Sequence, residues 1–406
     1  MMKINKSSNF ILIWILAFMS ALAPLATDMY LPSMGAVQKS FATTQSTVQL
    51  SITVFFVAFA FGQLLYGPIS DALGRRKPLI FGIIIYTVAS FACAAVNSIH
   101  LFVLFRFLQA LGGCAGVVIA RAIINDKFDI KQGASVMAIM MMIGSLAPML
   151  APSVGSLIVQ YAPWQAVFAL LGIFGLMLLA MMIWGLPETA KIENNSQFNL
   201  LSVLKNYASI IKDSRFMILV LTFALPLSSL FAYITTASFV FQDYFHLSQQ
   251  QFGVVFGINV LGSTTFSIIN AKIVKKISPY TVLQYAFLAM IFFVILMIIV
   301  SFLQLGFLLF EACLFMTMGM IGFIAPNATI LAMDRFRQKS GAASAVLGTT
   351  QFAIAGIVSF LAGSLNANTP ETLSAMMSFC ILLGWLAYLL LHRHLFRKAK
   401  KAMGIK

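Results

Sequence analysis

Four charged side chains lie within long apolar stretches of the chain, where burial makes charge costly, and one of them, Arg121, is near the edge of its stretch. Asp28, Arg106 and Glu311 each interrupt such a stretch in a sequence that is only 9% charged. An ionisable group within an apolar segment that spans a membrane is usually functional. Burial favours a neutral carboxyl and a nearby arginine favours the carboxylate, so the distance between them controls proton binding. We therefore expect Asp28, Arg106 and Glu311 to couple protons to a conformational change.

The position of each charged residue along its apolar stretch indicates its depth. A helix rises about 1.5 Å per residue, which places Asp28 in the outer third of the first stretch and Arg106 at a similar depth in the fourth. At this depth the two side chains could meet. Glu311 lies about as far past the start of the tenth stretch as Arg106 does in the fourth. Two alternatives stay open, namely an interfacial Asp28 and an Arg106 that is a structural hydrogen-bonding hub.

The composition of the chain is that of a polytopic membrane protein. Of its 406 residues, 61% are hydrophobic, and the mean hydropathy of +0.96 is far from that of soluble domains. Apolar segments long enough to cross the hydrocarbon region as helices recur, and they are too long and uniform for barrel strands. We predict an all-α membrane protein with twelve transmembrane helices. These cover residues 10–30, 47–68, 78–97, 101–124, 134–159, 164–186, 216–239, 250–271, 280–301, 304–331, 341–366 and 371–392.

The distribution of lysine and arginine predicts the orientation of these helices. Basic residues occupy one alternating set of connections, whereas the opposite set contains only Lys39. Because basic residues in short loops stay on the cytoplasmic side, both termini and the charged hairpin Gly67–Pro78 are predicted to be cytoplasmic. Topology thus explains the formal net charge of +15 better than nucleic-acid binding does, since the charges do not follow one polar face. We expect the lipid bilayer as a partner and no nucleic acid.

The helices are expected to form two halves of six. Residues 1–190 form the first half, residues 191–214 a cytoplasmic linker, and residues 215–406 a second half with a basic cytoplasmic tail. The later part of the linker has the apolar spacing of an amphipathic helix on the membrane surface. Lys275 and Lys276 stand about 200 residues after Arg75 and Arg76, so the halves are interpreted as diverged repeats. Parallel six-helix repeats around a midplane cavity are typical of secondary transporters.

Small residues and prolines mark the fifth segment as a kinked seam. Gly144, Pro148, Pro152 and Gly155 recur at near-helical spacing, where glycines permit close packing and prolines bend the helix. Such a seam can gate or seal a cavity. An aromatic cavity with sparse polar groups suits an amphipathic organic ligand. The polar candidates for its lining are Tyr30, Gln109, Tyr233, Asn259 and Asn327.

No cofactor is expected other than protons as the coupling ion. The four cysteines fall inside apolar stretches, where packing is their usual role, and no metal-ligand spacing occurs. A phosphate-binding G-x-x-x-x-G-K-[ST] motif is lacking, which excludes this route to ATP hydrolysis. We therefore expect a protein that is not an enzyme.

Several motifs resemble those of the major facilitator superfamily and, within it, of the Bcr/CflA group of drug:proton antiporters. GPISDALGRR is similar to the superfamily's loop motif, RFLQALGGCAG to its arginine motif and LAPMLAPSVG to its antiporter motif. The group is indicated by TDMYLPSM, ARAIINDKF, LPET, FAYITTASFVFQDYFHLS, FGINVLG and GAASAVLGTTQF. The resemblance covers nearly the whole chain.

The resemblance also implies roles for individual residues. Asp28 is the proton- and substrate-coupling acid and Arg106 its partner. Asp71 and Arg75 form a cytoplasmic clamp that engages the eleventh helix near Gly341. A nearby Asp126 can pair with Arg75. The full set expected for this conformational latch is Gly67, Asp71, Gly74, Arg75, Arg76, Asp126 and Gly341.

The sequence therefore favours a monomeric, proton-coupled exporter of small hydrophobic or amphipathic compounds in the bacterial inner membrane. One alternative is an exporter of a physiological solute, such as a siderophore, amino acid or peptide-like metabolite. A second is a membrane receptor or scaffold that transports nothing. Susceptibility to drugs and proton flux distinguish these hypotheses.

Overall fold

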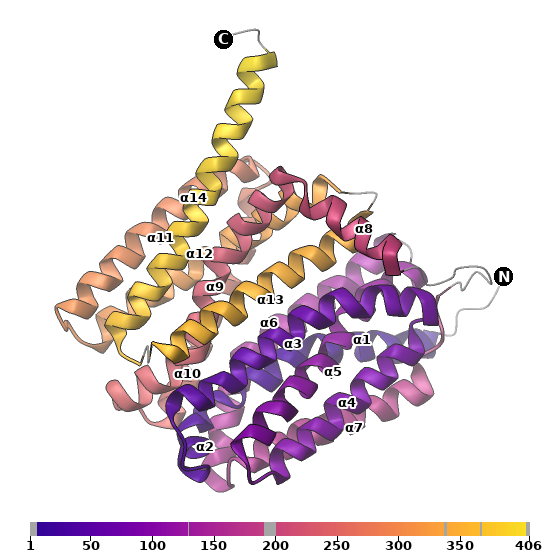
Figure 1. Ribbon diagram of the computed structural model, residues 1–406, viewed down its shortest axis with the longest axis vertical. Coiled ribbons are helices and arrows are strands. Elements are labelled where there is room, and N and C mark those ends of the chain that lie inside the picture. Colours follow the sequence, from indigo (N-terminus) through magenta and orange to yellow (C-terminus); the bar gives the residue numbers. More distant parts are fainter. Residues whose placement is uncertain (1–5, 129, 191–199, 337–338, 366–367, 403–406) are drawn as a thin grey trace. The chain divides into compact units, whose positions relative to one another are not determined.

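The computed structural model describes residues 6–128, 130–190, 200–336, 339–365 and 368–402. Every regular element in these ranges is helical, and twelve spans are long and apolar enough to cross a membrane (Figure 1). The predicted all-α fold with twelve transmembrane helices is confirmed. The cytoplasmic location of the termini stays a prediction.

The helices follow one another with short connections. In chain order they are α1 (Lys6–Asp28), η1 (Leu31–Ser33), α2 (Met34–Ser40), α3 (Gln45–Leu73), α4 (Arg76–Ala95), α5 (Ile99–Lys127), α6 (Ile130–Tyr161), α7 (Gln165–Gly185), α8 (Leu200–Ile211), α9 (Ser214–Phe239), η2 (Val240–Tyr244), α10 (Gln249–Ile273), α11 (Pro279–Phe302), α12 (Phe307–Asp334), α13 (Ser340–Ser364) and α14 (Pro370–Ala402). The first apolar span includes α1, η1 and α2 and reaches Ser40. Helix α8 lies where the sequence predicts an amphipathic helix, while residues 191–199 of the expected linker lie outside the described ranges.

The chain divides into two compact units. Unit 1 comprises residues 1–200 and 237–257, and unit 2 comprises residues 201–236 and 258–406. The division expected at the linker stays a prediction. Within unit 1, the Gln242 and Gln249 amides each donate to the Pro32 carbonyl, at 3.4 and 3.3 Å. Gln45 donates to Asp243 at 3.0 Å. These bonds join the end of α9, η2 and the start of α10 to the region around α2.

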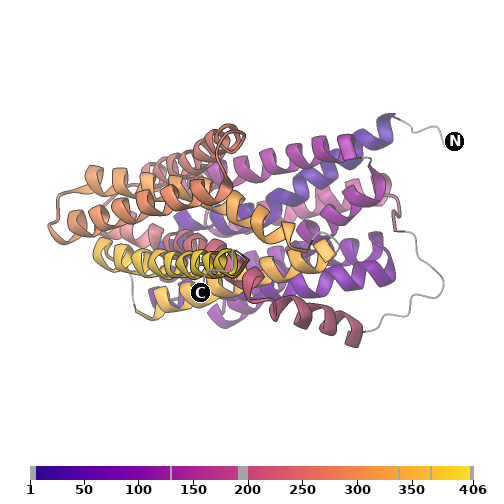
Figure 2. The same ribbon diagram turned by 90° about the horizontal axis from the view of Figure 1, so that it is seen from above.

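Close helix packing in unit 1 depends on glycine. A Cβ on Gly112 of α5 would lie 2.4 Å from the Gly82 carbonyl oxygen of α4, and one on Gly62 of α3 would lie 2.7 Å from the Cys114 Cβ of α5. Small residues at such crossings let backbones approach closely. Figures 1 and 2 show α3, α4 and α5 as neighbours within this unit.

Unit 2 contains one close helix contact that depends on glycine and one that is formed by aromatic rings. A Cβ on Gly322 of α12 would lie 2.3 Å from the Ser263 carbonyl oxygen of α10. Helices α11 and α14 pack through aromatic rings, with Phe287 5.5 Å from Trp385 between ring centroids. The Tyr388 hydroxyl donates to the Tyr280 carbonyl at 3.2 Å. Helix α14 continues to Ala402, so the described part of the predicted basic tail is helical.

The charged stretch Gly67–Pro78 is more helical than predicted. Helix α3 runs to Leu73 and α4 starts at Arg76, so only Gly74 and Arg75 lie between them. The expectation of a loop over this stretch is wrong. Gly74 has φ +86° and ψ 167°, a conformation almost restricted to glycine, and it reverses the chain in a very short connection.

Candidate functional site

Asp28 is the last residue of α1 and is buried within the protein, with 3% exposure. Its one described side-chain hydrogen bond joins Oδ1 to the Thr27 hydroxyl at 2.8 Å. The interfacial alternative concerns the depth of Asp28 in the membrane and stays open.

Arg106 lies on α5, fully buried among aromatic rings. Its guanidinium carbon is 4.6 Å from the ring centroid of Phe55, 5.3 Å from that of Tyr30 and 5.6 Å from that of Phe168. Nη1 donates to the Ala26 carbonyl at 2.9 Å and to Gln109 Oε1 at 2.5 Å, while Nε and Nη2 have no described hydrogen-bond partner. The rings partly replace the missing polar partners through cation–π attraction.

The structure does not join Arg106 to the Asp28 carboxylate in this conformation. Among the described residues, no ion pair joins them, and Arg106 binds the main chain of α1 at Ala26 instead. The described partner of Arg106 on α1 is thus a main-chain carbonyl, while the described partner of the Asp28 carboxyl is the neighbouring Thr27 hydroxyl. Arg106 therefore bonds to α1 and to Gln109 as expected for a structural hydrogen-bonding hub, which was the alternative to a proton-coupling role. The proton-coupling roles of both residues stay predictions.

Two of the expected cavity residues, Tyr30 and Gln109, belong to the same buried network. Gln109 donates to the Ser90 hydroxyl of α4 at 2.8 Å, and the Tyr30 hydroxyl lies 3.2 Å from that of Ser51 on α3. Both are fully buried. The serines were not singled out from the sequence, because a serine within an apolar helix commonly bonds its own backbone and gives no signal of a longer-range role.

The other expected cavity residues lie in unit 2. Asn259 donates to the Tyr233 hydroxyl at 3.2 Å, and both side chains are at most 2% exposed. Asn327 donates to Asn270 Oδ1 at 2.7 Å, which links α12 to α10. Their contact with a ligand stays a prediction.

Glu311 is also in unit 2, near the start of α12. It follows the first residue of α12 by four positions, whereas Arg106 follows that of α5 by seven. The two depths along their helices therefore differ by nearly one turn, about 4.5 Å. Both carboxylate oxygens of Glu311 are buried without a described hydrogen-bond partner.

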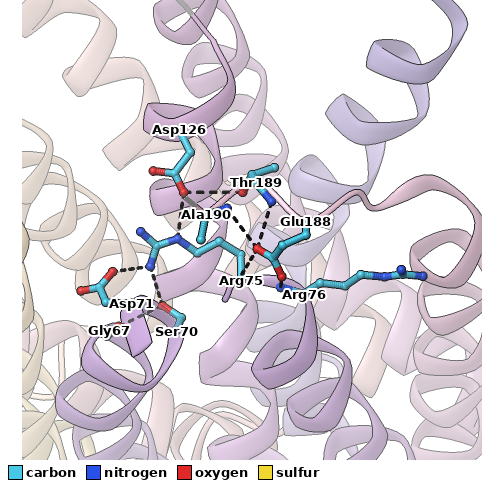
Figure 3. Close-up of polar contacts among 9 residues, drawn as sticks. All are labelled: Gly67, Ser70, Asp71, Arg75, Arg76, Asp126, Glu188, Thr189 and Ala190. Carbon is cyan, nitrogen blue, oxygen red and sulfur yellow. Dashed lines mark hydrogen bonds and ion pairs between the residues drawn. The ribbon is translucent and has the colours of Figure 1, made fainter. Parts of the chain in front are cut away.

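Arg75 is the centre of a polar cluster at the α3–α4 connection, which we call the latch cluster and which is drawn in Figure 3. Its side chain forms ion pairs with Asp71 and, at 2.8 Å, with Asp126 at the end of α5. Nη1 also donates to the Ser70 hydroxyl at 2.9 Å. The predicted pairing of Arg75 with Asp126 is confirmed. These contacts fasten the ends of α3 and α5 to the connection.

Glu188, just after α7, is the residue of the latch cluster that sequence reasoning missed. Its carboxylate accepts the backbone N–H groups of Arg75 at 2.8 Å and Arg76 at 3.1 Å, and those of Thr189 and Ala190 at 3.0 Å each (Figure 3). A carboxylate at the first turn of α4 satisfies N–H groups that lack helical partners. Partial burial alone would raise the pKa of Glu188, but these four donors outweigh it and hold the pKa below its usual value. The sequence feature that could have drawn attention to Glu188 is the LPET motif, residues 186–189, which contains it.

The three glycines expected in the latch have different surroundings. A Cβ on Gly74 would lie 2.6 Å from Glu188 Oε2, whereas a Cβ on Gly67 or on Gly341 would meet nothing within 4 Å. Gly74 is therefore required by both backbone conformation and space. Gly341 belongs to unit 2, so its engagement by Asp71 stays a prediction. Arg76 donates from Nη2 to the Ile183 carbonyl at 2.9 Å.

The predicted seam in the fifth span is the surface on which α6 meets α1. A Cβ on Gly155 would lie 2.0 Å from the Met29 carbonyl oxygen, and one on Gly144 would lie 3.7 Å from Ser20 Oγ. Pro148 and Pro152 both lie inside α6 and cannot donate to carbonyls one turn earlier. The small residues of this seam thus allow α6 to pack closely against the end of the first span, while a gating role stays a prediction.

A second ionic contact, also missed, joins α9 and α12 within unit 2. Arg335 Nε donates to Asp213 Oδ1 at 2.7 Å, and its Nη2 lies 2.5 Å from Oδ2. Asp213 Oδ1 also accepts the Phe216 N–H at 2.8 Å and so caps α9. The Arg335 guanidinium lowers the pKa of Asp213. Lys275 and Lys276, the sequence counterparts of the latch arginines, form no ion pair with any described residue.

Comparison with known proteins extends this description. The family model of the Major Facilitator Superfamily matches residues 16–360. The bicyclomycin resistance protein homolog of Haemophilus influenzae is 30% identical over 384 residues, which cover 95% of this chain and 96% of that protein. The multidrug transporter MdfA of Yersinia pestis is 29% identical over 254 residues, which cover 62% of each protein. A crystal structure of a D-xylose-proton symporter shares the fold, with a TM-score of 0.75 at 14% identity over 93% of this chain and 97% of that one.

The resemblance drawn from the loop, arginine and antiporter motifs is thereby confirmed. The match includes the part of α1 from residue 16 with Asp28, α5 with Arg106 and the whole latch cluster. With twelve apolar spans, the chain is a multi-pass membrane protein and belongs to the Major Facilitator Superfamily.

Proposed function

We propose that this protein is a proton-coupled exporter of small amphipathic or hydrophobic drugs in the bacterial inner membrane. The observation that carries the proposal is similarity over 95% of the chain to a bicyclomycin resistance protein homolog. Similarity to a multidrug transporter supports the same substrate class. Buried ionisable residues in both units provide candidates for coupling.

In this proposal Asp28 exchanges a proton for substrate. Its carboxyl is buried and has a neutral hydroxyl, rather than Arg106, as its described partner, an environment that favours proton binding. A small displacement of α1 relative to α5 that brings Arg106 toward the carboxylate favours proton release. Substrate and proton then compete for the same state of α1. One charge crossing the membrane supplies about 2.3 kcal/mol per 100 mV, enough for moderate uphill export.

The latch cluster has a separate role in the cycle. Its charged groups lie at the helix ends, away from Asp28 and Arg106 along α5. We expect Asp71→Ala to slow conformational cycling more than it weakens ligand binding. Unchanged transport together with lost binding would contradict this assignment.

Drug susceptibility tests the export proposal. An efflux-deficient bacterial host producing the wild type should tolerate more of at least one compound in a panel that includes bicyclomycin-like and phenicol-like drugs. Asp28→Asn should remove this tolerance, while Glu371→Gln, an acid at the start of α14, serves as the matched control and should retain it. Equal susceptibility of the wild type and the empty host across the panel would refute drug export.

Proton flux separates the remaining hypotheses. Substrate added to energised vesicles should release protons with the wild type, and Asp28→Asn should abolish this release. A receptor or scaffold produces no flux. An exporter of a physiological metabolite would instead be identified by an extra solute in spent medium, absent with Asp28→Asn.

A further inference from the structure

Helix α8 has two apolar faces, and the protein covers one of them. On the covered face, Tyr207 is 8% exposed and Ile210 is fully buried. The neighbouring Asn206 accepts a hydrogen bond at 3.4 Å from Nζ of Lys339, the residue just before α13. These contacts fix how α8 is rotated about its axis.

The second apolar face of α8 is open. Leu201, Leu204 and Ile211 are 60%, 52% and 52% exposed, and Ala208 is exposed as well. Successive members of this set are three or four residues apart, so they lie on one side of the helix and form a continuous stripe. Single exposed apolar side chains are ordinary, whereas a continuous exposed stripe indicates an interaction surface.

Two lysines follow one edge of this stripe. Lys205 and Lys212 are seven residues apart and stand four residues after Leu201 and Ala208, so both lie beside the stripe on the same side of the helix. Both are exposed, and neither forms an ion pair with any described residue. Residues 200–212 contain no Asp or Glu, so this edge carries positive charge alone. An apolar face bordered by lysines is typical of a helix that lies in a membrane interface.

The position of α8 in the chain also suits a membrane surface. Only Lys212 and Asp213 separate α8 from α9, whose apolar span begins at Ser214. Within unit 2, α8 runs across the direction of α9 (Figure 1), as a helix along a bilayer surface does beside one that crosses the bilayer. Asp213 forms an ion pair with Arg335, so its charge is already compensated. The stripe therefore lies next to the point where a span enters the hydrocarbon region.

We propose that the open face of α8 binds anionic phospholipids. Their acyl chains contact the stripe of Leu201, Leu204, Ala208 and Ile211, and their phosphate groups contact the two lysines at its edge. Lysine side chains reach headgroup phosphates while their methylene groups stay on apolar surface. One lysine near an anionic membrane surface changes a binding constant roughly fivefold, so these lysines select anionic over neutral lipid. Lipid binding of this kind is independent of which solute the protein transports.

Fluorescence quenching of the full chain in vesicles tests whether the stripe meets lipid. A fluorophore on Ala208→Cys marks the stripe, and one on Ser209→Cys, its exposed neighbour outside the stripe, is the matched control. The four native cysteines are buried, and the unsubstituted protein measures any labelling of them. In vesicles of phosphatidylcholine and phosphatidylglycerol, brominated acyl chains should quench the label at 208 more than the label at 209, and aqueous iodide should do the reverse.

The lipid that carries the bromine identifies the class of lipid on the stripe. With equal amounts of both lipids, the label at 208 should be quenched about fivefold more strongly when phosphatidylglycerol is brominated than when phosphatidylcholine is. Lys205→Gln together with Lys212→Gln should bring this ratio close to unity. Lys275→Gln together with Lys276→Gln replaces an exposed lysine pair between α10 and α11 and should leave the ratio unchanged.

Three results would overturn the proposal. Equal access of iodide to both labels would show that the stripe faces water. A label at 208 that neither bromine nor iodide quenches would show that protein, such as a second copy of the chain, covers the stripe. A ratio that is the same with and without Lys205 and Lys212 would show that these lysines do not select anionic lipid. The labels at 208 and 209 are read with both lysines in place, so the first two results do not depend on how well the lysine variants fold.

Discussion

Replacement of Gly74 by alanine tests whether the α3–α4 connection is held by Glu188. The new Cβ would lie 2.6 Å from Glu188 Oε2 and 2.9 Å from its Cδ, distances that require the carboxylate to move. It would also be attached to a residue with φ +86° and ψ 167°, where side chains are strained. The substitution therefore strains the backbone and displaces the group that caps α4.

The two effects can be estimated separately. Backbone strain in this region costs about 1–3 kcal/mol. Displacement of Glu188 leaves the Arg75 and Arg76 N–H groups without their charged acceptor, at about 1 kcal/mol each after allowance for exposure to solvent. Together these effects amount to about 3–5 kcal/mol, a large part of the stability of an ordinary domain.

Thermal unfolding of the purified protein in detergent measures this loss. Gly74→Ala should unfold at a clearly lower temperature than the wild type, and Gly67→Ala should not, since a Cβ there meets nothing within 4 Å and alanine favours the interior of α3. In a Glu188→Ala background the clash is absent, so Gly74→Ala should cost only the backbone strain. Equal unfolding temperatures for Gly74→Ala and Gly67→Ala would refute the packing argument. An equal cost of Gly74→Ala in both backgrounds would refute the role of Glu188.

Three further changes follow from the described contacts. Glu188→Gln should cost about 0.5–1 kcal/mol of unfolding free energy at neutral pH. Because folding lowers the pKa of Glu188, its carboxylate stabilises the protein above the usual glutamate pKa, and this stabilisation is lost as the pH falls through the pKa of the folded state. The melting temperatures of the wild type and the variant should therefore converge in acid. Asp213→Asn keeps the α9 cap but loses the ion pair with Arg335, and it should lower the free energy of chemical unfolding by about 0.5–1 kcal/mol. If Asp213→Asn lowers this free energy equally in an Arg335→Gln background, the ion pair is not the cause. Gly155→Ala places a Cβ 2.0 Å from the carbonyl oxygen of Met29, just after α1, and should cost about 1–3 kcal/mol. Gly144→Ala, with its nearest atom at 3.7 Å, should unfold like the wild type.

The twelve helices were predictable from the sequence because hydrocarbon leaves few alternatives. A backbone in lipid must satisfy its own hydrogen bonds, so apolar segments of about 20 residues become helices whatever their packing. The end of α3 was predicted less well. Charged residues after Gly67 indicate exposure to water, but an exposed segment can still be helical, and α3 continues through Asp71 to Leu73.

The side-chain partners in the candidate site were harder to predict, since they depend on how helices rotate about their axes. Depth along the sequence brings Arg106 to the level of Asp28, yet the guanidinium binds Ala26, two residues away. Glu188 illustrates a second difficulty. It meets Arg75 across 113 residues, and although the LPET motif drew attention to its position, nothing in that motif indicates that the glutamate caps another helix.

The packing of α3 and α5 determines how the latch cluster can influence the buried arginine. Helix α5 carries Arg106 near one end and Asp126 at the other, twenty residues apart, or roughly 30 Å at the rise of a helix. Gly62 and Gly112 bring α5 into close contact with α3 and α4, because added methyl groups would lie within 2.7 Å of neighbouring atoms. Since Asp126 of the latch cluster and Arg106 belong to the same helix, we expect them to move together. A change in the latch should then alter how fast this helix moves while leaving the bonds of Arg106 to Ala26 and Gln109 intact, and this is why Asp71→Ala is expected to affect the rate of transport rather than the affinity for substrate.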